Sequence, residues 1–270
     1  MCRLFGLYAN KPVNVHFSFY ESPVESFSKQ SLRNPHGWGI AWFDEKEWHL
    51  YKEPCPLFES IIAKEFIRDW IRGKIIISHV RLSSCGKIKK ENTHPWLYKG
   101  WAFAHNGTID DVRELEKLIS DEYKDFKGET DSERLFHLIV QEINNLEDPV
   151  EGIKSAVEKL LKNNISFSSL NFLLSDGNKL YALRYATKSL DYYTLYYIER
   201  PKEGCDLEKL SQETQQLIKM KLAYGERAII IASEKMSDEP YWKEIPNKHL
   251  VIVDSELDIK IIDLTEAENK

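Results

Sequence analysis

The amino-acid sequence predicts an α+β fold in which stacked β-sheets are covered by helices. Short segments rich in aromatic and β-branched residues form two groups along the chain, and segments of helical periodicity lie between them. This arrangement is typical of layered sheets with helices on their outer faces. The chain has 270 residues, of which 42% are hydrophobic, so it can bury a substantial core without disulfide bonds.

The predicted strands fall into an early and a late set. The early set covers residues 4–9, 38–43, 48–52, 74–80 and 101–105. The late set covers residues 168–174, 179–185, 192–199, 227–232, 250–254 and 259–264. The turn sequence Ser175-Asp176-Gly177-Asn178 predicts that two strands of the late set form a hairpin.

Three helices are predicted between these strands. Residues 59–72 carry apolar side chains at helical spacing, and Gly73 is expected to end that helix. The sequence Thr130-Asp131-Ser132-Glu133 has the form of a capping box, in which Thr130 and Glu133 satisfy each other's backbone N–H groups. Asp148-Pro149 predicts the start of the next helix, because proline fits the first helical turn without losing a hydrogen bond.

The whole chain, residues 1–270, is predicted to form one domain. No segment has the composition of a linker, and no repeat of about 20 to 50 residues is visible. The motifs that could carry chemistry lie in residues 2–133, whereas residues 165–264 are mainly strand-like.

Composition and charge exclude several classes of function. The net charge is −6 and lysine and glutamate are mixed along the chain, so no basic stripe is expected to bind nucleic acid. The longest apolar runs are too short to span a bilayer and the N-terminus lacks a secretory signal, which predicts a cytoplasmic protein without a membrane partner. The four cysteines are too widely spaced for a zinc knuckle or a redox dithiol, and no metal site is expected.

Cys2, directly behind Met1, is the most unusual feature. Removal of Met1 would place a thiol and a free α-amine on the same residue. An α-amine titrates near pH ~8, so a useful fraction is free base at neutral pH and can take the thiol proton. Taken alone, however, Cys2 is better explained as a small residue at a frayed end of the chain.

Two charged residues could bind the ends of a small zwitterion. Arg81 follows a predicted strand and could hold a carboxylate with its planar guanidinium, although most single arginines form surface ion pairs. Asp131 is expected in the first turn of a helix, where the macrodipole keeps it ionised and able to bind an ammonium group. Helix capping alone would also explain an aspartate at this position.

Two further motifs could contact a substrate through their backbone. The side-chain N–H of Asn106 and the backbone N–H of Gly107 could converge on an oxyanion, although Asn-Gly is also a common tight turn. Gly37, Trp38 and Gly39 form a loop that runs into a strand. Its glycines allow close approach of a ligand, but the loop could equally be a turn beside a core tryptophan.

The ordered combination of these motifs resembles the class II glutamine amidotransferases, which are N-terminal-nucleophile enzymes. The similarity is greatest to small stand-alone members, which include amidotransferases and γ-glutamyl hydrolases of glutathione and ergothioneine metabolism. The matching segments are residues 1–6, 34–42, 79–81, 92–96, 104–107 and 128–133, followed by 232–234, Trp242 and Pro246. The resemblance implies a four-layer αββα sandwich of two mainly antiparallel sheets.

The resemblance also implies a role for each candidate residue. It identifies Cys2 as the nucleophile with its own amine as the base, and Asn106 and Gly107 as the oxyanion pair. Arg81 would hold the substrate carboxylate and Asp131 its α-ammonium group. Further substrate contacts are implied for Ser84, His94, Gly37, Trp38 and Gly39.

One loop departs from the family pattern. Some members carry Ala-Thr-His where this chain has Ser83-Ser84-Cys85. Ser84 can replace a threonine hydroxyl, but Cys85 cannot replace a histidine donor, which leaves the contacts of this loop open. His36 occupies a position that is commonly aspartate in the stand-alone proteins, and no role is assigned to it.

The implied reaction is hydrolysis of the side-chain amide of L-glutamine. Attack by Cys2 would release ammonia and form a γ-glutamyl thioester, which water would convert to glutamate without metal or organic cofactor. No phosphate-binding glycine loop is present, so the chemistry that would use ammonia is either absent or on a partner subunit; a homo-oligomer is also left open. The sequence leaves two alternatives: a larger γ-glutamyl compound as substrate, or a non-catalytic binding or assembly subunit.

Overall fold

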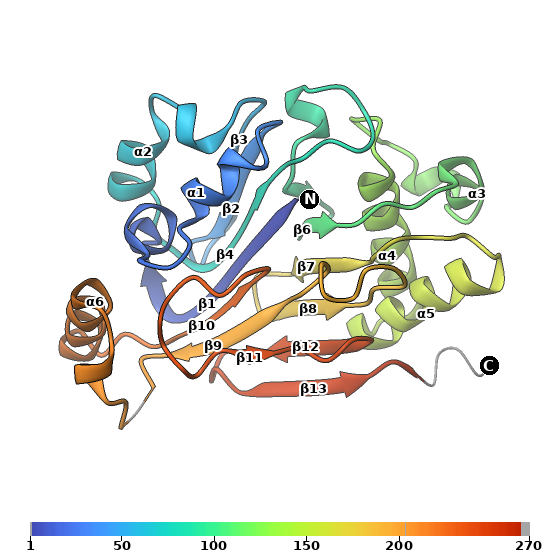
Figure 1. The fold of residues 1–270 in the computed structure, drawn as a ribbon. Coiled ribbons are helices and arrows are strands. Elements are labelled where there is room, and N and C mark those ends of the chain that lie inside the picture. Colours follow the sequence, from blue (N-terminus) through green and yellow to red (C-terminus); the bar gives the residue numbers. More distant parts are fainter. Residues whose placement is uncertain (1, 203, 266–270) are drawn as a thin grey trace.

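Two antiparallel sheets stacked face to face form the centre of the molecule (Figure 1). The computed structural model describes residues 2–202 and 204–265; Met1, whose removal would expose the amine of Cys2, lies outside these residues. Among the described residues, the first sheet has seven strands in the order β11 (Lys243–Glu244), β9 (Tyr196–Arg200), β10 (Ala228–Ala232), β1 (Arg3–Val13), β4 (Gly73–Val80), β2 (Trp38–Phe43) and β3 (Trp48–Glu53). The second has six in the order β13 (Ile259–Asp263), β12 (His249–Val253), β8 (Leu180–Arg184), β7 (Asn171–Ser175), β6 (Trp101–Asn106) and β5 (Trp96–Tyr98).

Helices cover the outer faces of both sheets. Helices α1 (Phe27–Leu32) and α2 (Ala63–Asp69) lie over the first sheet, and α3 (Val112–Lys117), α4 (Asp131–Leu146) and α5 (Pro149–Lys162) lie over the second (Figure 1). Helix α6 (Gln212–Ala223) lies at the opposite end of the first sheet from the chain start (Figure 1). Single turns of π- or 3₁₀-helix occur at Phe17–Glu21, Leu57–Glu59, Lys90–Asn92, Asp121–Tyr123 and Leu207–Lys209. The predicted four-layer αββα sandwich is confirmed.

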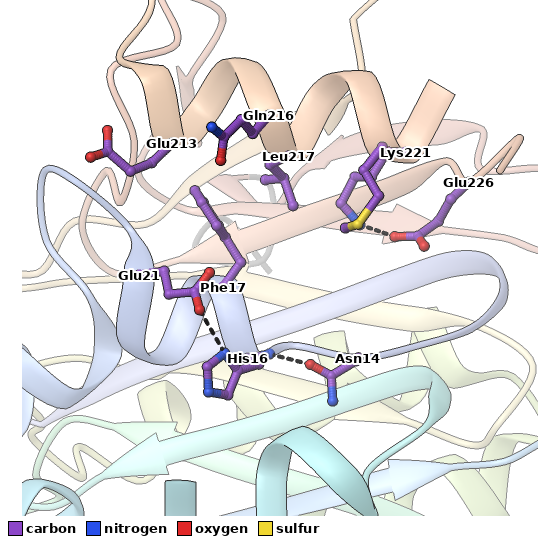
Figure 2. A pocket seen from close by; sticks show the side chains of 10 residues that line it. Asn14, His16, Phe17, Glu21, Glu213, Gln216, Leu217, Lys221 and Glu226 are labelled. Atoms are coloured by element: carbon purple, nitrogen blue, oxygen red, sulfur yellow. Dashed lines mark hydrogen bonds and ion pairs between the residues drawn. The ribbon is translucent and has the colours of Figure 1, made fainter. Parts of the chain in front are cut away.

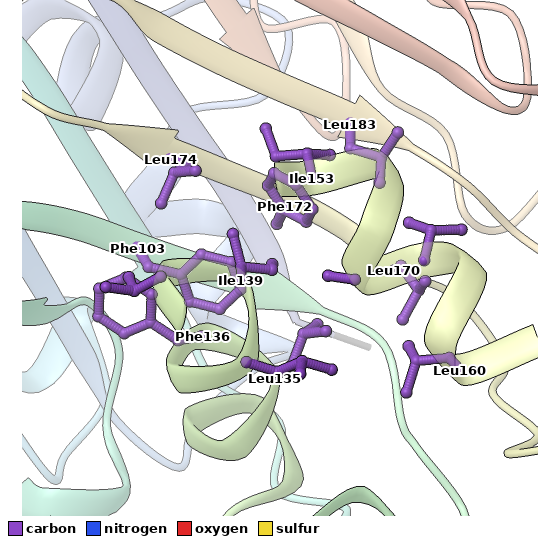
Figure 3. Close-up of a cluster of buried hydrophobic side chains, with 14 of the residues drawn as sticks. Phe103, Leu135, Phe136, Ile139, Ile153, Leu160, Leu170, Phe172, Leu174 and Leu183 are labelled. Carbon is purple, nitrogen blue, oxygen red and sulfur yellow. The ribbon is translucent and has the colours of Figure 1, made fainter. Parts of the chain in front are cut away.

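Three apolar cores separate these layers. Between the sheets, residues such as Leu4, Ile77 and Leu173 are completely buried. Between the second sheet and its helices, the rings of Phe103 and Phe136 stack with their centroids 4.8 Å apart (Figure 3). Because alternate residues of a strand point to opposite faces, strands with a core on both sides are apolar almost throughout. This explains why the predicted central strands were recognisable as continuous apolar runs.

Most predicted elements are confirmed within a few residues. The Ser175–Asn178 turn joins β7 and β8, which pair in antiparallel register. Asp148 caps α5 by accepting hydrogen bonds from Val150 N and Glu151 N, and Pro149 is its first residue. The sequence reading missed β5, β11, α1, α3 and α6, which are short or weakly patterned.

The helix predicted at residues 59–72 is wrong in extent. Helix α2 covers only Ala63–Asp69. The side chains of Ile62 and Trp70, two of the apolar residues at helical spacing in this segment, are 47% and 75% exposed. Gly73 begins β4 instead of simply ending the helix. A Cβ atom at Gly73 would lie 2.9 Å from Trp42 Cβ, so the close packing of β4 against β2 requires glycine here.

The predicted capping box at α4 is half correct. Thr130 Oγ1 accepts a hydrogen bond from Glu133 N at 3.3 Å, as expected for an N-cap. The Glu133 carboxylate, however, does not return to Thr130. It accepts hydrogen bonds from Lys127 N at 2.7 Å and Gly128 N at 2.8 Å, because the incoming chain folds back over the helix start. The carboxylate therefore fixes the loop before the helix.

Two absences hold within the described residues. None of the helices there is both long and apolar enough to cross a bilayer. All four cysteines are free thiols.

Candidate active site

Strand pairing brings the beginning of β1 and the end of β4 together. Arg3 lies opposite Val80 in the antiparallel pair, so Cys2 lies beside Arg81. Strand β6 faces this pair from the second sheet and ends at Asn106 (Figure 1). Helix α4 begins at Asp131, close enough for its charge to act on the Cys2 thiol. Four segments that are distant in sequence therefore meet at one end of the sandwich.

The Cys2 thiol is held by the backbone of Leu82. Leu82 N donates a hydrogen bond to Cys2 Sγ at 3.2 Å, and Sγ lies 3.3 Å from Leu82 O. Burial raises the pKa of the Cys2 thiol, and the Leu82 N–H and the positive charge of Arg81 oppose this only in part. The thiol is therefore protonated at neutral pH, and nucleophilic attack requires a base that takes its proton.

Arg81 is buried and its guanidinium is bound to the loop that follows it. Nη1 donates to Lys87 O at 3.1 Å, while Nη2 donates to Ser83 Oγ at 3.0 Å, to Cys85 O at 2.6 Å and to Gly86 O at 3.3 Å. These bonds shape residues 83–87 around one positive charge. The carboxylate-binding role stays a prediction, because a ligand would have to share or exchange these bonds.

Asn106 and Gly107 end β6 in a tightly enclosed position. Asn106 is 2% exposed and, within the described part of the chain, its Oδ1 has no hydrogen-bond partner. A Cβ atom at Gly107 would lie 1.9 Å from Ser169 O and 2.7 Å from His105 Nε2. Only glycine fits this approach, so the residue serves more than a generic turn.

Asp131 is fixed at the start of α4. Its Oδ2 accepts a hydrogen bond from Ile109 N at 2.7 Å, and the carboxylate is almost completely buried. This bond ties the helix start to the loop that follows Gly107.

His105 connects this helix start to the second sheet. Its Nε2 lies 3.0 Å from Ser169 O and its Nδ1 lies 2.9 Å from Ser132 Oγ. A carbonyl oxygen only accepts, so Nε2 carries the hydrogen and the neutral ring accepts from Ser132 through Nδ1. Burial lowers the pKa of His105, although the charge of Asp131 opposes this. The neutral ring of His105, the residue before Asn106, therefore links Ser132 of α4 to Ser169.

The loop at residues 37–39 lies next to Arg81, but its tryptophan faces elsewhere. Gly37 O accepts a hydrogen bond from Arg81 N at 2.8 Å. Trp38 packs in the core between the first sheet and its helices, where Nε1 donates to Glu53 Oε2 at 2.9 Å. Cys2 is on the other face of this sheet, so the indole is a core side chain, as the alternative interpretation of this loop expects, and the substrate contacts implied for Gly37, Trp38 and Gly39 stay predictions.

His94 is buried between the sheets. A Cβ atom at Gly39 would lie only 2.3 Å from His94 O, so glycine allows the segment around His94 to enter this space. Ser84 is exposed, and its Oγ accepts a hydrogen bond from Thr108 Oγ1 at 3.1 Å. This contact links the loop after Arg81 to the loop after Gly107.

Sequence reasoning missed two residues that hold these loops. His36, to which no role was assigned, accepts a hydrogen bond through Nδ1 from Ser83 N at 2.9 Å. Tyr193 donates from its hydroxyl to Ser168 Oγ at 2.8 Å, and Ser168 Oγ in turn accepts from Thr108 N at 3.0 Å. His36 precedes the Gly37-Trp38-Gly39 motif and could have been suspected, whereas nothing in the sequence relates Tyr193 to this end of the molecule.

A separate cavity of about 420 Å³ lies beyond the other end of β1 (Figure 2). It is lined in part by His16, Phe17, Leu217 and Lys221, none of which the sequence reading singled out. Lys221 is buried there and forms an ion pair with Glu226. No group of three or more His, Cys, Asp or Glu side chains suited to a metal ion occurs in residues 2–202 and 204–265.

Comparison with known proteins identifies the family. The sequence matches the family described as glutamine amidotransferases class-II over residues 1–268. The chain therefore belongs to the class II glutamine amidotransferases. An uncharacterised protein of Methanocaldococcus jannaschii is 32% identical to it over 266 residues, which cover 93% of this chain and 69% of the relative.

Solved structures of class II amidotransferases share the fold. A glutamine aminotransferase class-II domain protein from Silicibacter pomeroyi superposes with a TM-score of 0.64 at 22% identity, covering 97% of this chain and 99% of the other. The glutamine phosphoribosylpyrophosphate amidotransferase from Bacillus subtilis superposes with a TM-score of 0.68 at 18% identity. This match covers 98% of this chain but 49% of the other, so this chain corresponds to about half of that protein.

Proposed function

We propose that this class II glutamine amidotransferase hydrolyses the side-chain amide of L-glutamine through Cys2. The observation that carries the proposal is the grouping of the Cys2 thiol, Arg81, Asn106-Gly107 and Asp131 at one end of the sandwich. A free amino acid with a distal amide needs a nucleophile, an oxyanion site, and opposite charges for its α-carboxylate and α-ammonium groups. The site offers one candidate for each.

The reaction would begin with proton transfer from the buried thiol. Once Met1 is removed, the α-amine of Cys2 would take the thiol proton, and the thiolate would attack the amide carbon. Donors at Asn106 and Gly107 would stabilise the oxyanion, a contribution of about 3 kcal/mol for each donor in related chemistry. The C–N bond would break as the amine returns its proton to the leaving nitrogen, releasing ammonia. Water would then cleave the γ-glutamyl thioester.

Substrate recognition would rest on Arg81 and Asp131. The guanidinium already binds four oxygen atoms of residues 83–87, so a substrate carboxylate would exchange with one of these loop oxygens. Such an exchange would couple the shape of the loop to binding. The bond to Ile109 N uses Oδ2 of Asp131, and among the described residues Oδ1 has only a long 3.5 Å approach to Ser132 Oγ, so Oδ1 is available to a substrate ammonium group.

The proposal is tested with purified protein whose intact mass shows an N-terminal Cys2. Wild type should release equal amounts of ammonia and glutamate from glutamine, and Cys2→Ala should lose this activity by at least about 1,000-fold while keeping its thermal unfolding temperature. A glutamine-like electrophile should label wild type at Cys2 only. Absence of both turnover and labelling would support the non-catalytic alternative and refute the proposal.

A larger γ-glutamyl compound is the second candidate substrate. A cavity of about 380 Å³ is lined by Arg3, the residue after the nucleophile, and by Tyr192 and Glu234, among others; Arg3 Nη1 also donates to Cys2 O at 3.2 Å. This space could take a leaving group bulkier than ammonia. A kcat/KM for γ-glutamyl peptides that exceeds the value for glutamine by more than about tenfold would favour this substrate class. Comparable kcat/KM values for the two substrates would favour glutamine. The ammonia would then be released in the cytoplasm to a partner subunit.

A further inference from the structure

Two buried histidines beside Cys2 have ring nitrogens without protein partners. His79 and His94 are 0% and 4% exposed, and neither Nδ1 nor Nε2 of either ring forms a hydrogen bond with any described residue. The His79 ring approaches the backbone of His105 without the geometry of a hydrogen bond. An unpaired buried polar group costs about 1–3 kcal/mol, so four such atoms in one place call for a binding role.

The two rings share the space between the sheets with the nucleophile. His79 lies opposite Leu4 of β1 and opposite Gly39 of β2, and Leu4 points into the core between the sheets. Residues paired across two neighbouring strands point to the same face of the sheet, so the His79 ring enters this space beside Leu4. Leu4 is two residues from Cys2 along the chain. The missing side chain at Gly39 admits the segment of His94, whose ring centroid lies 4.0 Å from that of His79.

Asn106, at the end of β6 in the opposite sheet, adds a fifth unpaired atom. Its buried Oδ1 has no partner within the described chain, and it belongs to the pair expected to bind the oxyanion. Besides its contact with His79, the His94 ring packs against Trp96 at a centroid distance of 4.0 Å. The other buried histidine nearby, His105, has both ring nitrogens paired. Burial beside these rings therefore does not by itself leave a histidine unpaired.

The electrostatics of the enclosure favour a neutral ligand. Burial, with the positive charge of Arg81, holds the pKa of His79 well below its usual range. Burial and the neighbouring His79 do the same for the pKa of His94. Each neutral ring offers one N–H donor and one nitrogen acceptor. Cations are disfavoured because Arg81 and the buried Lys52 supply positive charge nearby.

We propose that His79, His94 and Asn106 form a binding site for a small neutral molecule that both donates and accepts hydrogen bonds, namely ammonia or water. This inference rests on the proposed function, and it assigns to the enclosure the ammonia that leaves the amide. Breakage of the C–N bond, with return of the proton from the Cys2 amine, yields NH₃, which the neutral rings bind. The same site holds NH₃ when it attacks the thioester in reverse and the C–S bond breaks.

Hydroxylamine is a suitable probe because it is small, neutral and nucleophilic. Its nitrogen would attack the γ-glutamyl thioester, the C–S bond would break, and the Cys2 thiol would recover a proton, giving a γ-glutamyl hydroxamate. With glutamine as donor, hydroxamate formation by wild type should saturate with hydroxylamine concentration. His79→Leu and His94→Leu should raise the half-saturating concentration at least about fivefold, whereas His79→Gln, which retains a donor and an acceptor, should stay within about twofold of wild type.

His16→Leu is the matched control. His16 is also largely buried with an unpaired Nε2, but it lies beyond the far end of β1 beside the separate cavity (Figure 2). The half-saturating hydroxylamine concentration of His16→Leu should therefore equal that of wild type. A rate that rises linearly with hydroxylamine in wild type, or an unchanged half-saturating concentration in both leucine variants, would overturn the inference.

A crystal structure separates this inference from the proposed function. It should place an ordered water within hydrogen-bond distance of a ring nitrogen of His79 and of His94, and this water should be lost in His79→Leu. Side chains filling the enclosure would overturn the inference even in an active glutaminase. Conversely, an ordered water in a protein without glutaminase activity would refute the proposed function and leave the binding site standing.

Discussion

At Gly107 the backbone passes so close to the second sheet that a single methyl group has no room. Its Cβ position lies 1.9 Å from Ser169 O, a backbone atom that cannot rotate away. We expect Gly107→Ala to displace the end of β6 and with it Asn106, lowering kcat for glutamine hydrolysis at least about 100-fold. Steady-state kinetics and circular dichroism would measure the loss of activity and confirm that the fold persists.

Gly100→Ala supplies the control for that substitution. Gly100 has a φ of +84° and no atom within 4 Å of its Cβ position, so alanine there costs only backbone strain of about 1 kcal/mol. The variant should unfold at a slightly lower temperature and keep its kcat. Equal activity of Gly107→Ala and Gly100→Ala would show that the position of Asn106 does not matter for the reaction.

Single residues differed in how far the sequence could place them. Cys2, Arg81, Asn106 and Asp131 were singled out because each carries a chemical group in a motif whose order is informative, and their roles stay predictions. The role of His36 was not found, since its bond to Ser83 N joins two loops about 50 residues apart in sequence. The sequence also left open whether Trp38 lies in a ligand loop or in the core. A glycine on either side suggested a ligand loop, whereas the alternation of β2 turns the indole toward the helices.

Helix α4 is the element that carries the candidate ammonium site. Thr130 Oγ1 accepts from Glu133 N and sets the first turn in which Asp131 lies. We expect Thr130→Ala to cost about 1 kcal/mol of unfolding free energy, as for other N-caps. Because the frayed turn contains Asp131, KM for glutamine should rise several-fold, with a smaller change in kcat. Urea denaturation and steady-state kinetics would measure the two effects.

Thr130→Ser tests whether the hydroxyl is responsible. Serine keeps the capping oxygen and should restore both the unfolding free energy and KM to near the wild-type values. If Thr130→Ala loses stability without any change in KM, the cap supports the helix but not the substrate site.

Elements were predictable where one physical signal dominated. Strands with a core on both faces appear as uninterrupted apolar runs, and β2, β4 and β10 were found in this way. Helix α2 was overextended because Ile62 and Trp70 match helical spacing but lie on the protein surface, so periodicity did not report burial. Helix α6 has alternating polar and apolar residues with no dominant face and gave no signal.

At the scale of the molecule, two buried lysines in separate parts of the sandwich differ in what surrounds their charge. Lys52 on β3 lies with its ammonium 5.6 Å from the centre of the Trp96 ring, and burial lowers the pKa of its side chain to about 8. Burial also lowers the pKa of Lys221 on α6 to about 8. Lys221, however, forms an ion pair with Glu226 (Figure 2). The two lysines therefore have similar pKa values, but Lys221 is paired with a carboxylate whereas Lys52 lies against an aromatic ring.

The pKa of Lys52 makes its contribution to stability depend on pH. The folded-state pKa of about 8 lies below the ordinary value of 10.5, so the folded protein binds this proton less tightly than the unfolded chain. The charged lysine therefore destabilises the fold fully below pH 8, and the penalty disappears as the pH rises toward 10.5. The upper limit of the penalty is about 3 kcal/mol at pH 7 and about 1 kcal/mol at pH 10.

Replacing each lysine by methionine separates the cost of burial from the value of the partner. Lys52→Met leaves no carboxylate alone, because the nearby Glu133 keeps its bonds to Lys127 N and Gly128 N. It should raise the unfolding free energy at pH 7 by about 1–3 kcal/mol, and by less at pH 10. Lys221→Met leaves Glu226 without its partner and should lower stability by about 3 kcal/mol. Urea denaturation at both pH values measures these differences, and a destabilised Lys52→Met at pH 7 would mean that the contact with Trp96 outweighs the cost of burying the charge.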